Sequence, residues 1–175
     1  MTSTERTDIL DALHKHRELF RVPARGVDDE QARTRSTISE LTLGGLVKHV
    51  TAVERNWAQF VLEGPAPSPE IDWANVDWSN PPPEVAAYAD GFRMLESETL
   101  AGLLEEYDAV AAATDQLVAT VDLDARQLLP KAPWFPPGAS WSARRVFIHI
   151  VAETAQHAGH ADIIRETIDG QKSMG

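Results

Sequence analysis

The chain has 175 residues, of which 43% are apolar and 25% charged, and this length and composition suit one soluble globular domain. The formal net charge of -11 argues against nucleic acid or an anionic membrane as the main partner, because both bind basic surfaces. There is no cysteine, which excludes disulfides, thiolate metal ligands and a cysteine nucleophile.

Hydrophobic periodicity predicts four helices, two of them in the first third of the chain. The first covers about residues 8–20 and stops before Pro23. A polar connector follows over residues 26–40. The second helix begins after Thr42, whose hydroxyl suits an N-cap, and ends at Gly64.

Residues 64–83 are rich in proline, which excludes a regular helix. Trp73 and Trp78 lie in this segment, and large aromatic side chains are costly to leave in water. We therefore expect an ordered crossover that these two rings pin to the helices. The alternative is a floppy surface loop.

The third helix is the clearest, because its apolar residues recur at spacings of three and four, as at the seam of a bundle. They are Leu100, Leu103, Tyr107, Val110, Thr114, Leu117 and Val121. A second irregular stretch covers residues 129–138. The fourth helix is expected from about Ser140 to Ile168, closed by Gly170.

No segment shows a convincing strand pattern, so we predict an all-α fold. Four long helices joined by long crossovers indicate a four-helix bundle, formed as one domain over residues 1–175. The start of the chain lacks the apolar run of a secretory signal, and no stretch predicts a membrane helix. We therefore expect a cytoplasmic protein.

The fourth helix places polar side chains in the middle of its apolar stripe. At about 100° per residue, Glu153 lies in line with Val146 and Ile164, and three histidines share that direction; they are His149, His157 and His160. An unpaired buried carboxylate costs several kcal/mol or becomes protonated. Glu153 and His157 are four residues apart and project side by side, so both could chelate one ion.

A third ligand would come from a facing helix, and His49 is the candidate. It lies three residues after Leu46 and four before Val53, on the apolar side of the second helix. The alternatives are a hydrogen-bonded core histidine and a Glu–His pair without metal, and spacing alone leaves them open. His14 and His16 point to different faces, and we assign them no role.

Two segments resemble the DinB-like (DinB/YfiT) family of metal-binding bundles. Residues 42–57, with the sequence TLGGLVKHVTAVERNW, are similar to the second helix of that family, and residues 149–166, HIVAETAQHAGHADIIRE, to the last helix. The resemblance spans essentially the whole chain. It implies an up-down-down-up four-helix bundle that holds a divalent metal ion through His49, Glu153 and His157. With a carboxylate at Glu153, the sequence resembles the branch of the family that includes the mycothiol-dependent maleylpyruvate isomerase and the mycothiol transferases.

Three protein ligands leave an open position, as in catalytic sites. Two imidazoles and a carboxylate suit zinc, our first choice, and also nickel, iron, manganese or cobalt. A bound water could become a hydroxide nucleophile, or an incoming thiol could lose its proton and attack an electrophile. The branch favours a low-molecular-weight thiol such as mycothiol, which fits a chain without cysteine. His160 is then a candidate proton carrier, a fourth ligand or a partner of the ligands.

We therefore expect a metal-dependent thiol S-transferase or isomerase that acts on a small molecule. The alternatives are a metal-dependent hydrolase and a non-catalytic metal-binding stress or ligand-binding protein. A homodimer through an apolar helix face is also compatible with the sequence.

Other side chains near these motifs have ordinary explanations. Trp57 and Tyr107 are expected in the core, with a substrate platform as the alternative, and Glu54 is expected at the surface or beside the ligands. Three aromatic residues before or at the start of the fourth helix could line a pocket mouth or anchor the loop: Trp134, Phe135 and Trp141. Two arginines could attract an anionic substrate or be solvated: Arg144 and Arg145.

Overall fold

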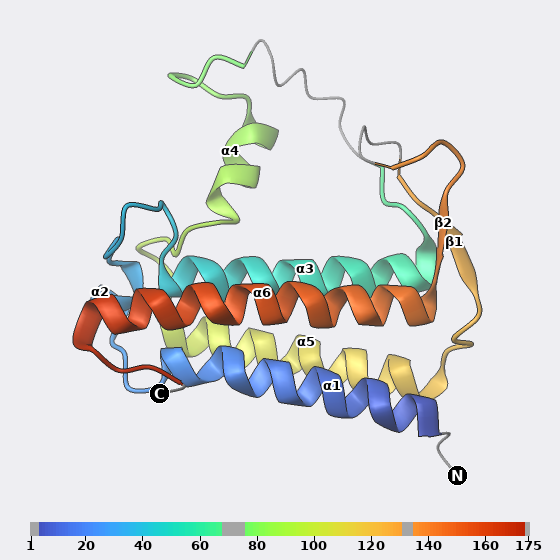
Figure 1. The fold of residues 1–175 in the computed structure, drawn as a ribbon. Coiled ribbons are helices and arrows are strands. Elements are labelled where there is room, and N and C mark those ends of the chain that lie inside the picture. The colour runs from blue at the N-terminus through green and yellow to red at the C-terminus, as the bar shows by residue number, and fades with distance from the viewer. Residues whose placement is uncertain (1–3, 68–75, 131–134, 174–175) are drawn as a thin grey trace.

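A computed structural model of the chain describes residues 4–67, 76–130 and 135–173 (Figure 1). Its elements in chain order are α1 (Thr4–Arg21), the 3-10 turn η1 (Val22–Ala24), α2 (Asp29–Arg33), α3 (Leu43–Glu63), α4 (Pro83–Asp90), α5 (Leu100–Thr120), β1 (Arg126–Leu128), β2 (Ser140–Ser142) and α6 (Ala143–Asp169). The fold is mostly helical, and the all-α prediction is confirmed. The exception is a short antiparallel pair in which Gln127 faces Trp141. None of the helices in the described segments is long and apolar enough to cross a bilayer.

The long helices α1, α3, α5 and α6 lie side by side (Figure 1). α1 packs against α6, α6 against α3, α3 against α5, and α5 also contacts α1. α3 and α5 run in one direction, and α1 and α6 run in the other (Figure 1). α3 and α5 are neighbours that run in the same direction, so the chain must return from the end of α3 to the start of α5. This requirement explains the long crossover over residues 64–99.

The ends of the long helices follow the local capping signals. Thr42 accepts a hydrogen bond from the backbone N–H of Gly45, as predicted for an N-cap, and α3 ends at Gly64 with a φ of 78°. Ser142 caps α6, whose last turn closes at Gly170 in the left-handed conformation. α6 therefore starts after Ser140, because residues 140–142 pair as a strand.

Two short helices lie in segments where no helix was expected. α2 begins with a capping box in which Asp28 and Gln31 exchange hydrogen bonds, and α4 begins with proline in its first turn. The prediction that tryptophan pins the crossover is wrong for Trp78, which is 67% exposed, and Trp73 lies outside the described residues. Buried Val85 and Met94 attach this part of the crossover instead.

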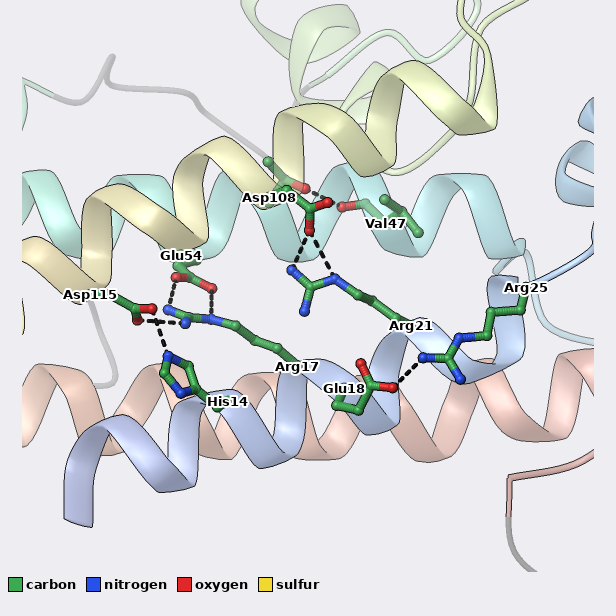
Figure 2. Close-up of polar contacts among 10 residues, drawn as sticks. His14, Arg17, Glu18, Arg21, Arg25, Val47, Glu54, Asp108 and Asp115 are labelled. Atoms are coloured by element: carbon green, nitrogen blue, oxygen red, sulfur yellow. Dashed lines mark hydrogen bonds and ion pairs between the residues drawn. The ribbon is translucent and has the colours of Figure 1, made fainter. Parts of the chain in front are cut away.

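The described residues form two apolar clusters in the interior, one around Phe20 and Tyr107 and one around Phe147 and Val118. Arg17 and Glu54 belong to neither cluster, although both are buried. Their side chains form a bidentate ion pair, with nitrogen–oxygen distances of 2.5 and 3.2 Å (Figure 2).

The Arg17–Glu54 pair joins α1 to α3, and Asp115 of α5 extends it. Asp115 accepts a hydrogen bond from Arg17 at 2.7 Å and lies 2.6 Å from Nε2 of His14 (Figure 2). The expectation that Glu54 is a surface or ligand-side residue is therefore wrong. Its carboxylate is fully buried because a guanidinium from another helix neutralises it.

Candidate functional site

The structure brings together the three side chains that the sequence singled out as metal ligands. His49 on α3 and His157 on α6 meet edge to face, with ring centroids 4.9 Å apart. Oε2 of Glu153 lies 3.7 Å from Nε2 of His157, one helical turn away on α6. The cluster therefore lies where α3 packs against α6.

These side chains lie at the edge of the buried face of α6 and not in its middle. The side chain of His157 is 13% exposed and that of Glu153 is 29% exposed. The fully buried line of α6 runs through Val146, Ile150 and Thr154. The helical projection of the sequence did not show this offset, because threonine counts as polar and Thr154 was therefore not included in the buried face. In the fold its hydroxyl donates to the carbonyl of Ile150, so Thr154 is buried without an unsatisfied group.

Partial burial favours the neutral form of the imidazoles. Burial lowers the pKa of His49, although Glu153 opposes that change. Burial also lowers the pKa of His157, and neighbouring His49 and His160 lower it further. At neutral pH both rings are therefore neutral, the form that can offer a nitrogen lone pair to a metal ion.

Two further histidines of α6 flank the predicted ligands. Nδ1 of His160 lies 3.3 Å from Nδ1 of His157, so a proton on one nitrogen can be shared with the other. This contact leaves Nε2 of His157 on the side of Glu153. At the other end, Nε2 of His149 lies 3.5 Å from Oε1 of Glu153.

The crossover supplies an aromatic contact that the sequence analysis missed. Phe92, just after α4, stacks on His49 with ring centroids 4.5 Å apart, and Tyr88 packs edge to face on Phe92 at 5.2 Å. Two adjacent glycines of α3 allow this approach: a Cβ at Gly44 would overlap the side chain of Met94, and a Cβ at Gly45 would overlap the backbone of Phe92. A Gly-Gly pair inside a helix was the available signal.

A second aromatic group surrounds His149. Trp57 and Trp141 are stacked with centroids 5.0 Å apart, and both contact His149 edge to face, at 4.8 and 5.1 Å. Phe135 packs on Trp141, and the guanidinium of Arg145 lies 4.2 Å from the centroid of the Trp141 ring. Trp57 therefore packs beside His149, and its side chain is only half-buried.

Tyr107 and Arg144 lie apart from the cluster. Tyr107 is fully buried in the core, as expected. Arg144, at the start of α6, forms ion pairs with Glu5 and Asp124, and these two carboxylates neutralise its charge. Trp134 lies outside the described residues.

A cavity of about 540 Å³ is lined in part by Trp57, the residue that contacts His149, and none of the clustered histidines lines it. Its lining comes from the second half of α3 and from the irregular segments beside it: Asn56, Trp57, Gln59, Phe60, Glu63, Gly64, Pro65, Ala66, Pro67 and Pro130. This volume is in the range of small-molecule sites. Another cavity of about 560 Å³ lies between α1 and α6, where Ile9 and Phe147 line it, and like the first it has no clustered histidine in its lining.

The donor atoms of the cluster do not converge on one point. Within residues 4–67, 76–130 and 135–173, no group of three or more His, Asp or Glu side chains is arranged to hold an ion. The chemistry nevertheless fits, because two neutral imidazoles and a carboxylate from facing helices lie in one cluster. Binding would require His49, Glu153 and His157 to turn their donor atoms toward a common point.

Comparison with known proteins gives a family and a fold. The sequence pattern of the family described as mycothiol-S-transferase matches residues 8–170. No curated protein matches this chain. A solved structure, described as the conserved protein of locus from Enterococcus faecalis, is similar over 98% of this chain and 99% of its own, with a TM-score of 0.65 and 16% identity. At that identity the similarity shows a shared fold alone.

Proposed function

This chain belongs to the mycothiol-S-transferase family, and on that premise we propose that it is an enzyme that transfers or uses a low-molecular-weight thiol such as mycothiol. The observation that carries the proposal is the cluster of His49, Glu153 and His157 between α3 and α6, inside the matched residues. We also propose that the four long helices form the up-down-down-up bundle of DinB-like proteins, as one domain.

We propose that His49, Glu153 and His157 hold a divalent metal ion, with zinc as the first choice. The ion would supply positive charge that lowers the pKa of a thiol bound beside it. The sequence has no cysteine, so the sulfur must come from a small molecule. Neutral His49 and His157 suit ligation, and the Glu153 carboxylate lowers the net charge of the loaded site.

His160 is the proposed proton acceptor. It touches His157 and is only half-buried, so its other ring nitrogen can exchange protons with solvent or substrate. In the proposed step the thiol gives its proton to His160. The sulfur lone pair then forms a bond to the electrophilic carbon of a small-molecule substrate, and the leaving group departs with the electrons of the broken bond.

The cavity beside Trp57 is the proposed place for the body of the thiol or of its electrophile. It contains amide groups of Asn56 and Gln59 and the carboxylate of Glu63, and no lysine or arginine lines it among the described residues. These groups suit hydroxyl or amide partners better than anionic ones.

Metal content decides the first part of the proposal. Tag-free wild type should contain near-stoichiometric metal by elemental mass spectrometry, and His49→Ala and Glu153→Ala should lose it. His14→Ala changes a histidine of α1 and is the matched control. If wild type stays metal-free after reloading, the proposed centre does not exist.

Thiol dependence decides the second part. The metal-loaded protein should consume a low-molecular-weight thiol in the presence of electrophiles, and the rate should depend on both. Turnover of an ester or amide without thiol would support the hydrolase alternative instead.

A further inference from the structure

We propose that His149 is a positioning residue for Glu153, which fixes the carboxylate so that one oxygen faces the predicted metal ligands. No role was assigned to His149 from the sequence. The inference rests on the proposed function, because Glu153 is a proposed ligand.

The two oxygens of Glu153 face different imidazoles. Oε1 lies 3.5 Å from Nε2 of His149, one turn before Glu153, and Oε2 lies 3.7 Å from Nε2 of His157, one turn after it. A proton on Nε2 of His149 can attract Oε1 and leave Oε2 for the side where His157 meets His49. Without His149, the carboxylate could rotate toward solvent, since its side chain is 29% exposed.

His149 is itself held in place. Trp57 on α3 and Trp141 on β2 both contact its ring edge to face, and they stack on each other. Edge-to-face aromatic contacts stabilise a ring beyond the contribution of its burial. A side chain braced from two elements loses little further entropy when it holds a carboxylate.

The spacing along α6 argues against His149 as a direct ligand. His149 and His157 are eight residues apart, a rise of about 12 Å along a helix. One ion can bridge side chains one turn apart, such as Glu153 and His157, more readily than side chains two turns apart. His149 therefore acts through Glu153, as the partners of metal ligands commonly do.

The test compares zinc affinity in wild type, His149→Phe, His149→Gln and His16→Phe, measured by competition with a chromophoric chelator. Phenylalanine keeps a ring against the two indoles but removes the nitrogen, so affinity should fall about 10- to 100-fold. Glutamine keeps a donor and should recover part of that loss. The control His16→Phe on α1 should bind zinc like wild type. Thermal unfolding of the metal-free proteins verifies that each variant folds.

The outcomes separate this inference from the proposed function. Unchanged affinity in His149→Phe overturns the positioning role while the metal centre stands. Loss of zinc as complete as in Glu153→Ala would make His149 a ligand and also overturns it. If the glutamine variant binds zinc as weakly as a folded phenylalanine variant, the proposed role of the His149 ring nitrogen is overturned. If wild type binds no zinc, the metal centre and this inference fail together.

Discussion

The ring of His49 stacks on the ring of Phe92, with centroids 4.5 Å apart and planes inclined by 24°. The two residues lie 43 positions apart in the chain, and their contact attaches the crossover to the predicted metal ligands. It depends on Gly45, because a Cβ at that position would overlap the backbone carbonyl of Phe92. The glycine pair of α3 thus lets the crossover pass close enough for Phe92 to hold the ring of His49.

Gly45→Ala should destabilise the protein, although alanine is normally the better helix former. The added methyl group must displace the backbone of Phe92, and overpacking of this kind costs about 1–3 kcal/mol. Gly159→Ala is the matched control, because Gly159 lies in α6 with nothing within 4 Å of a built Cβ, and it should gain about 0.5–1 kcal/mol. Urea unfolding of both variants measures the difference, and equal stabilisation would contradict the close approach at Gly45.

The buried ion pair predicts a strong effect of single substitutions. Glu54→Leu should cost about 3–5 kcal/mol of unfolding free energy, because it leaves the Arg17 guanidinium buried with only Asp115 as a carboxylate partner. The double variant Arg17→Met/Glu54→Leu removes both charges and should recover most of that loss. Arg25→Ala is the control, since its pair with Glu18 is exposed and should contribute less than about 1 kcal/mol. Chemical denaturation gives the values, and a double variant no more stable than Glu54→Leu would contradict the argument.

Local signals in the sequence predicted the long helices well. Thr42, Gly64 and Gly170 act through neighbours a few residues away, so the ends of α3 and α6 could be located from the chain alone. The start of α1 was placed four residues too late, because Thr4–Thr7 contains no apolar residue to mark a helical face.

Contacts between distant residues could not be predicted in the same way. Glu54 was expected at the surface or beside the ligands, because its partner Arg17 lies 37 residues earlier and charge alone does not identify a buried pair. Phe92 was not considered, because its contact with His49 depends on the path of the crossover. For the site itself, helical spacing grouped Glu153 with three histidines correctly, but it placed them too deep in the interior.

Metal binding should stabilise the folded protein by mass action. A ligand at 100 times its dissociation constant adds about 2.7 kcal/mol to the unfolding free energy when it binds the folded state only. Addition of zinc should therefore raise the Tm of wild type and of His14→Ala. His157→Ala removes one proposed ligand and should abolish the shift, and so should a chelator. Differential scanning fluorimetry measures the shift, and the same increase in His157→Ala would exclude His157 as a ligand.

Acid stability should depend on Asp169 at the end of α6. The hydrogen bond from Arg165 lowers the pKa of Asp169 below its usual value of 3.8, with a further contribution from the backbone N–H of Gln171. A carboxylate with a lower pKa in the folded state stabilises it above the unfolded pKa, and this contribution disappears as the pH falls through the folded pKa. Asp169→Asn should therefore be less stable than wild type by a constant amount from about pH 5 to 8, and the difference should shrink below about pH 4. Urea unfolding at a series of pH values tests this, and a difference that persists unchanged in strong acid would show that Asp169 stabilises α6 without its charge.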